Sequence, residues 1–276
     1  MSVNSPRVAM PPGACDTHMH IFDPRFATVP GLTVPPRDAT VAAYRALQQR
    51  LGLQRVVIVQ PACYGADNGC TLDAMEALGT AARGVAVIDP AAPLAEWQRL
   101  DALGMRGIRF HMFPGGALGW DDLAAMAAKA AGVGWHVQLQ LPGEALPERE
   151  KTLQALPCEL VVDHIGRFTA PVARERGGWP VLRRLMDGGR CWVKLSAPYH
   201  GSKSGPPAYA DLGALASELV AAVPERLLWA SNWPHPSVKG EPPDDADLFD
   251  LLATWAPDAA VRRSILVDNP GRLYRF

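Results

Sequence analysis

The chain has 276 residues, of which 48% are hydrophobic and 20% are charged, and its formal net charge at pH 7 is -1. This composition is typical of a globular protein and argues against disorder. So small a net charge gives no overall attraction to nucleic acid or to an anionic membrane, and we expect neither as a partner. The length fits one α/β barrel, a fold that typically takes about 250 residues.

Five cysteines are scattered along the chain without a C-x-x-C pair: Cys15, Cys63, Cys70, Cys158 and Cys191. Their odd number and irregular spacing predict free thiols in a reducing compartment rather than a disulfide framework or a zinc knuckle. Residues 1–13 lack the apolar core of a signal peptide, and no run of about 18 apolar residues follows that could span a bilayer. We therefore expect a soluble cytoplasmic protein of undetermined oligomeric state.

Eight apolar runs of strand length are spread along the chain. They are rich in Val, Ile and Leu and do not alternate strictly with polar residues, which is typical of parallel strands buried on both faces. The predicted strands cover residues 14–18, 55–60, 84–89, 107–112, 136–141, 160–165, 191–196 and 227–231. The predicted helices cover residues 38–52, 71–82, 94–104, 120–132, 145–156, 178–189, 209–223 and 246–256.

This alternation of strand and helix, without a repeat or a low-complexity linker, favours a single (β/α)8 TIM-type barrel over an open doubly wound sheet. We predict an N-terminal extension over residues 1–13 and one barrel domain over residues 14–276. Three Gly/Pro-rich tracts, 29–36, 113–119 and 199–207, follow the first, fourth and seventh strands. They are expected at the rim where barrels carry their active sites.

Polar side chains close most of the predicted strands, and in a barrel these strand ends meet at one mouth. His18 and His20 are two apart on a strand, so they face the same side and can both point inward. An H-x-H pair alone is more often a loop-capping feature, but a second pair, Asp163 and His164, shifts the balance toward a site. His164 could bind a metal, donate a hydrogen bond to a carbonyl, or act as acid or base, and a structural role is the alternative.

Three cations at these strand ends are costly to bury without a carboxylate, and they are Arg109, Arg167 and Lys194. Each either pairs with an acid of the protein or binds an acidic substrate, and an ordinary surface position is a further alternative for Arg167. Gln138 and Gln140 share one face of a strand and could give neutral hydrogen bonds or merely fill the core.

The segment LLWASNWPHP, residues 227–236, is an apolar run that ends abruptly in polar residues between prolines. The prolines restrict the backbone, which we expect to aim Asn232 and His235 at the mouth.

The motifs DTHMH (16–20), DHIGR (163–167) and SNWPH (231–235) resemble the amidohydrolase superfamily, in particular the branch of 2-pyrone-4,6-dicarboxylate lactonase and D-galactarolactone isomerase. The likeness includes PPRD (35–38) and the ending NPGRLY (269–274). It implies a barrel enzyme that attacks the carbonyl of a small acidic lactone. The branch is thought to work without a catalytic metal, so no cofactor is expected. If zinc were bound, His18, His20 and His164 would hold it.

One departure from the family pattern lies at the end of the eighth strand, where Asn232 replaces an aspartate expected to activate water. An amide cannot take up that proton at physiological pH. The substitution is either native or was introduced to stall turnover. Val34, Ala62 and His200 stand where the lactonase pattern has Tyr, Ser and Arg, which favours a hydroxylated sugar-acid lactone over a pyrone dicarboxylate.

These observations assign catalytic roles to His18, His20, His164 and Asn232. The predicted substrate-binding residues are Arg109, Arg167, His111, Gln140, Lys194, Tyr199 and His235. Ring-opening hydrolysis is placed slightly ahead of isomerisation, in which the acyl group moves between substrate hydroxyls. A zinc-dependent decarboxylase and an inactive binding protein are further alternatives.

Overall fold

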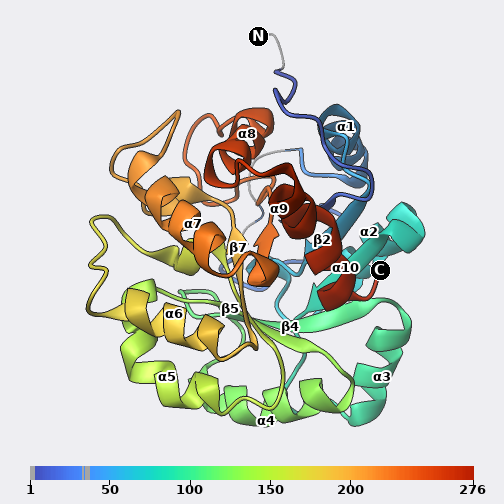
Figure 1. Ribbon diagram of the computed structural model, residues 1–276. Coiled ribbons are helices and arrows are strands. Elements are labelled where there is room, and N and C mark those ends of the chain that lie inside the picture. The colour runs from blue at the N-terminus through green and yellow to red at the C-terminus, as the bar shows by residue number, and fades with distance from the viewer. Residues whose placement is uncertain (1–3, 33, 35–37) are drawn as a thin grey trace.

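The computed structural model describes residues 4–32, 34 and 38–276 and contains eight parallel strands, in the sheet order β1 to β8. The strands are β1 (Cys15–Met19), β2 (Arg55–Val59), β3 (Ala82–Ala86), β4 (Met105–His111), β5 (His136–Gln140), β6 (Leu160–Val162), β7 (Cys191–Leu195) and β8 (Leu227–Trp229). Helices surround the strands on the outside of the barrel (Figure 1). The predicted (β/α)8 barrel is confirmed.

Hydrogen bonds beyond the strand ladders join β1 and the residue after it to the end of β8 and the segment that follows. The Thr17 hydroxyl donates to the carbonyl oxygen of Trp229 at 2.8 Å. The amide of Asn232 donates to the His18 carbonyl at 2.9 Å, and the His20 amide donates to the Trp233 carbonyl at 2.9 Å. The seam between the first and last strands is therefore held at the same rim that carries His18, His20 and Asn232.

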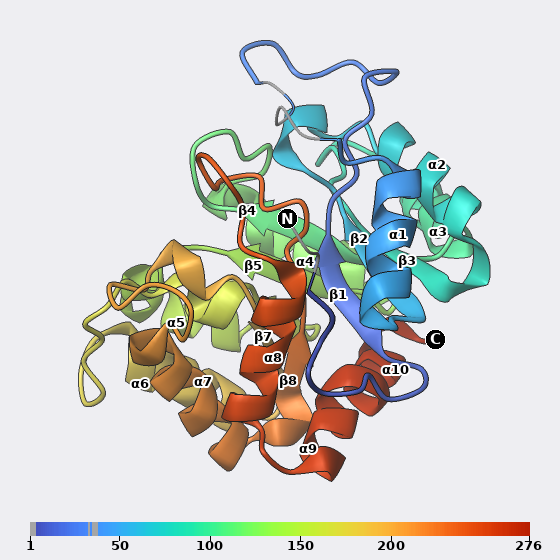
Figure 2. The same cartoon turned by 90° about the horizontal axis from the view of Figure 1, so that it is seen from above.

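Each strand is followed by a helix, and the view in Figure 2 shows these helices packed around the strands. The helices are α1 (Val41–Leu51), α2 (Gly69–Leu78), α3 (Leu94–Ala102), α4 (Trp120–Gly132), α5 (Leu146–Gln154), α6 (Gly178–Asp187), α7 (Ala210–Ala222) and α8 (Asp245–Trp255). Thr40 and Asp244 cap α1 and α8 by accepting backbone N–H groups. Two short helices, α9 (Ala259–Arg263) and α10 (Asn269–Tyr274), complete the chain and were not predicted.

The largest differences between the predicted and the observed strand bounds are in the third and sixth strands. The third was expected at 84–89 and spans Ala82–Ala86. The sixth was expected to reach residue 165 but ends at Val162, because the backbone turns into a 3-10 segment with His164 at φ 56 and Ile165 at φ 52. Such left-handed conformations cannot continue a strand. His164 therefore lies on a turn above the sheet rather than within it.

The interior of the barrel is partly polar. An apolar layer that includes Val57, Val85 and Leu228 packs inside the strands, and a larger apolar core lies between strands and helices. Lys194 and Gln138 are fully buried within the barrel. Because polar groups in a core must find partners, this inner polar cluster fixes the floor beneath the mouth.

The described N-terminal residues run across the outside of the barrel. Arg7 forms an ion pair with Asp250 of α8 at 2.8 Å. The predicted rim tract 29–36 and the motif PPRD lie partly outside the described residues. All five cysteines are free thiols. Within the described residues, no helix is long and apolar enough to cross a membrane.

Candidate active site

A cavity of about 260 Å³ opens at the carboxyl ends of the strands. Among the residues predicted for the site, those that line it are His20, Arg109, His111, Gln140, His164 and Asn232. The other predicted residues are not among its lining residues: His18, Arg167, Lys194, Tyr199 and His235. Six of the predicted side chains thus line one cavity, and the other five do not.

His18 and His20 form a contacting pair, as their spacing predicts. Their Nε2 atoms are 3.3 Å apart, and His18 is fully buried while His20 reaches the cavity. His20 Nδ1 donates to the carbonyl oxygen of Val59 at 2.7 Å, which leaves its Nε2 as an acceptor in the neutral ring. Burial and the nearby Arg109 lower the pKa of His20 to about 3, so this ring is neutral at physiological pH.

His164 enters the cavity from the turn that ends β6. Its Nδ1 lies 2.8 Å from the Ser196 hydroxyl, and its ring centroid lies 4.8 Å from that of His18. Burial, followed by the neighbouring His18, lowers the pKa of His164 well below its usual range. If Ser196 donates to Nδ1, the neutral ring carries its proton on Nε2 and can donate it to a ligand.

Arg109 of β4 is a buried guanidinium that lines the cavity without an ion-pair partner among the described residues. Its two terminal nitrogens donate to the Gln60 carbonyl at 2.6 Å and to Gln140 Oε1 at 2.9 Å, and its Nε has no protein acceptor. These neutral acceptors hold the group in place. The Asp163 carboxylate acts on its charge but forms no ion pair with it. The same Gln140 Oε1 lies 3.1 Å from His111 Nδ1, so Gln140 orients both side chains.

Lys194 of β7 lies beneath the cavity, where groups of the protein surround it. Its ammonium donates to the Thr17 carbonyl at 2.8 Å and to Gln138 Oε1 at 2.7 Å, and lies 3.5 Å from Asp163 Oδ1. Desolvation lowers the pKa of Lys194 to about 8, and the Asp163 carboxylate opposes that shift. This arrangement supports a structural role beneath the histidines rather than the predicted contact with substrate.

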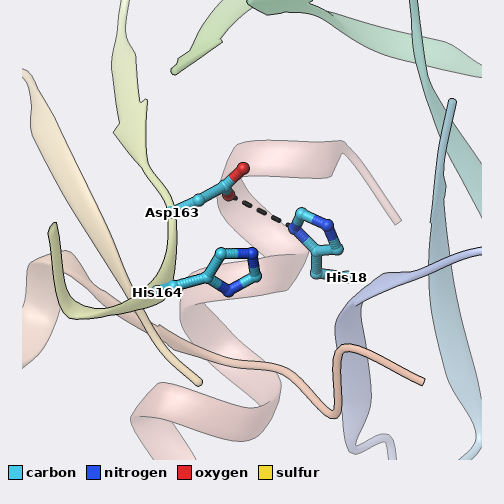
Figure 3. A group of neighbouring side chains, drawn as sticks. All are labelled: His18, Asp163 and His164. Atoms are coloured by element: carbon cyan, nitrogen blue, oxygen red, sulfur yellow. Dashed lines mark hydrogen bonds and ion pairs between the residues drawn. The ribbon is translucent and has the colours of Figure 1, made fainter. Parts of the chain in front are cut away.

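His18, Asp163 and His164 bring potential metal-ligand atoms within 4.8 Å of one another, as drawn in Figure 3. His20, a member of the zinc set expected from the sequence, is not in this group. Both oxygens of Asp163 are already engaged: Oδ1 with His18 Nδ1 at 3.3 Å and with Lys194, and Oδ2 with Gln138 at 3.1 Å. Lys194 also lies 3.3 Å from His18 Nδ1. A carboxylate that is already paired with a buried ammonium is a poor ligand for a resident metal, so this donor set does not fit one.

Arg167 follows His164 on the same turn but points to the rim. Its guanidinium lies 4.8 Å from the centre of the Phe113 ring, on the loop after β4, and its Nη1 is buried without a hydrogen-bond partner. Burial lowers the pKa of Arg167 from its ordinary value. Arginine nevertheless keeps its charge in proteins. It is thus a second cation near the cavity entrance.

Asn232 reaches the cavity and is tied to residues behind it. Its Nδ2 donates to the Tyr199 hydroxyl at 2.8 Å, and this hydroxyl lies 2.9 Å from His235 Nδ1. His235 Nε2 lies 3.1 Å from Asp245 Oδ1 at the start of α8. The prediction that Tyr199 and His235 contact substrate is not supported by this geometry, because neither lines the cavity.

Some residues of the site were not assigned to it from the sequence. Cys63, which was expected in a plain loop more than against a ligand, lines the cavity, and so does His200. Ser196 and Asp245 lie outside the lining and contact His164 and His235. Burial raises the pKa of Cys63 to about 11, so it is a thiol and not a nucleophilic thiolate at neutral pH. No role was assigned to Asp245 from the sequence, because an aspartate at the start of a helix is ordinary there.

A family model described as an amidohydrolase, Amidohydro_2, matches residues 15–276. The chain belongs to this amidohydrolase family. The resemblance drawn from DTHMH, DHIGR and SNWPH is thereby confirmed.

Known members of this amidohydrolase branch match the chain over almost its full length. D-Galactarolactone isomerase of Agrobacterium fabrum is 36% identical, covering 100% of this chain and 96% of the relative. The 2-pyrone-4,6-dicarboxylate hydrolase of Comamonas testosteroni is 37% identical, with 98% and 93% covered. A crystal structure of an Agrobacterium tumefaciens protein without ligand superposes with a TM-score of 0.95 at 35% identity, covering 100% of this chain and 98% of that one.

Proposed function

We propose that this amidohydrolase acts on the ester carbonyl of a small carboxylated lactone, and that a sugar-acid lactone is its substrate rather than a pyrone dicarboxylate. The unpaired, buried guanidinium of Arg109 on the cavity wall carries the proposal. A substrate carboxylate would form the ion pair that Arg109 does not form with any described residue of the protein. The two relatives named above act on lactones according to their names, which supports the same reaction class.

The site also supports a role for His164 in polarising the carbonyl. If the Ser196 hydroxyl donates to Nδ1, His164 carries its proton on Nε2 and can donate it to the carbonyl oxygen of a substrate in the cavity that His164 lines. Negative charge that develops on this oxygen during attack is stabilised by such a fixed donor in a dry site. Arg109 adds positive charge in the same cavity. His18 contacts His20 through their Nε2 atoms.

A specific observation favours isomerisation over hydrolysis. Attack by water needs a base, but Asn232 cannot take a proton, and burial lowers the pKa of the cavity residues His20 and His200 to about 3. In isomerisation, a substrate hydroxyl attacks the acyl carbon, and neutral His20, whose Nε2 is an acceptor, can relay the proton of that hydroxyl to the departing ring oxygen. Intramolecular attack brings an effective molarity of about 10⁵ M or more, which compensates for so weak a base.

Hydrolysis, which the sequence placed slightly ahead, stays the second candidate. The observation in its favour is that both histidines of the H-M-H pair are present and in contact, at 3.3 Å. In this scheme a histidine would replace the missing aspartate as base.

Product analysis separates the two reactions. We expect aldarolactones incubated with the protein to exchange ring size without release of free diacid, as followed by NMR. The Asn232→Asp variant is expected to release free diacid, because it restores a carboxylate that can accept a proton from water. Free diacid as the sole product of the unsubstituted chain would contradict isomerisation. Turnover of no lactone by either form would contradict the proposed reaction class and favour a binding protein.

We further propose that the enzyme works without a metal ion, since Lys194 already neutralises Asp163. EDTA treatment followed by gel filtration is expected to leave the rate unchanged, with far less than one equivalent of zinc found by elemental analysis. Stoichiometric zinc together with chelator-sensitive turnover would contradict this proposal and favour the decarboxylase alternative. The cytoplasmic location expected from the sequence stays a prediction.

A further inference from the structure

The backbone around Asn232 is fixed from several sides. Its amide donates to the His18 carbonyl at 2.9 Å, and its own carbonyl accepts the His235 amide at 2.8 Å. Its φ of 59 lies in the left-handed region, which asparagine tolerates better than most residues. With the backbone held, the main freedom left to this buried residue is a flip of its carboxamide, which exchanges Oδ1 and Nδ2.

The chain of hydrogen bonds behind Asn232 has one consistent set of protons when His235 is neutral. The Asp245 carboxylate only accepts, so His235 Nε2 carries the proton and its Nδ1 is an acceptor. The Tyr199 hydroxyl must then donate to Nδ1, and its oxygen is left to accept from Asn232. Only Nδ2 of the carboxamide can satisfy that oxygen, which turns Oδ1 toward the cavity.

The hydrogen-bond network behind Asn232 is held in place at its far end, at Asp245. Asp245 is buried, and its second oxygen lies 3.9 Å from an Arg50 nitrogen. Asn232 and His235 are also buried, at 2% and 1% exposure, so water competes little for these hydrogen bonds. The orientation of the cavity amide is thus imposed by a carboxylate on α8, three hydrogen bonds away.

From this geometry we propose that Asp245, His235 and Tyr199 are positioning residues that present Asn232 Oδ1 as a hydrogen-bond acceptor for the attacking hydroxyl. The inference rests on the proposed lactone chemistry and deepens it. Asn232 does not remove the proton; it aligns the O–H of the nucleophile so that its lone pair faces the acyl carbon. This role suits an intramolecular attack, in which alignment matters more than basicity.

The orientation can be tested without any substrate. The asparagines of the chain are at positions 4, 68, 232 and 269, so side-chain ¹⁵N labelling of Asn gives a simple NMR spectrum. We expect one Asn232 amide proton shifted downfield by its hydrogen bond to Tyr199, and we expect that shift to vanish in Tyr199→Phe. An Asn232 signal that Tyr199→Phe leaves unchanged would overturn the proposed network, whether or not the protein acts on a lactone.

The catalytic consequence has a kinetic test. Tyr199→Phe is expected to lower kcat about tenfold with little change in KM, because loss of one orienting hydrogen bond lets the amide flip while the cavity wall is kept. In the Asn232→Asp background the same substitution should cost about twofold or less, since a carboxylate presents an oxygen in either orientation. Equal losses in both backgrounds, or a rise in KM alone, would overturn the positioning role.

Two further variants serve as controls for this kinetic test. Tyr209→Phe removes the hydroxyl of a buried tyrosine outside the chain of hydrogen bonds and is expected to keep full activity. His235→Leu removes the acceptor of Tyr199 and should lower kcat in the same direction as Tyr199→Phe, which provides a second readout if that variant folds poorly. Full activity of His235→Leu with a folded chain would contradict the proposal.

Discussion

Arg109→Gln is expected to lower kcat/KM for carboxylated lactones by about 10- to 100-fold, mostly through KM. The guanidinium is the buried cation on the cavity wall that has no carboxylate partner in the described part of the chain, and charge-assisted hydrogen bonds contribute about 1.5–3 kcal/mol. Steady-state kinetics on an aldarolactone measures the loss. Glutamine keeps a donor near Gln60 and Gln140, so the fold should be preserved.

The control for charge recognition is Arg106→Gln. Arg106 lies on the same strand but pairs with Asp101 at 2.9 Å and does not line the cavity. This variant should keep its KM. For an uncharged lactone, kcat/KM should be the same for the unsubstituted chain and for Arg109→Gln. An equal loss on charged and uncharged lactones would mean that Arg109 supports the structure of the site and does not recognise a carboxylate.

Lys194→Met is expected to lower the free energy of unfolding by about 3 kcal/mol. Lys194 and Asp163 are both fully buried and 3.5 Å apart, and removing one partner leaves an uncompensated charge in the barrel. Methionine keeps most of the volume, so loss of the ion pair is the main change. Urea unfolding of the protein, followed by circular dichroism, measures this difference.

A double variant isolates the ion pair from other effects. Lys194→Met combined with Asp163→Asn removes both charges and should be more stable than Lys194→Met alone. Lys151→Met, at an exposed position on α5, is the matched control and should change stability little. A double variant less stable than Lys194→Met would mean that the buried charge of Asp163 is not balanced mainly by Lys194.

The sequence predicted the fold because a parallel barrel carries its signal locally. Each strand of this protein is a short Val/Ile/Leu-rich run, and each is followed by a helix of ordinary length. Errors occurred where the backbone leaves the regular pattern. The sixth strand was drawn through His164, although the chain turns at that residue with a positive φ. An apolar run does not reveal where its strand stops, because periodicity does not encode a turn of this kind.

The sequence was also sufficient to gather His20, His164, Arg109 and Asn232 at one mouth, because strand ends in a barrel converge whatever their separation along the chain. It did not separate the residues that face the cavity from those behind it. Lys194 and His235 looked like ligands of a substrate by position, and the structure surrounds them with Asp163, Gln138 and Asp245.

The sequence by itself determined the barrel, the family and the set of side chains available to the site, since these follow from local patterns and motifs. Tertiary structure alone decided which buried cation has no carboxylate partner and which side-chain atom of Asn232 faces the cavity. Both depend on partners far away in the chain: Arg109 on Gln60 and Gln140, and Asn232 on Tyr199 and, through His235, on Asp245. Pairing of buried charges and the direction of a hydrogen-bond chain are set by all their neighbours at once, which no local pattern records.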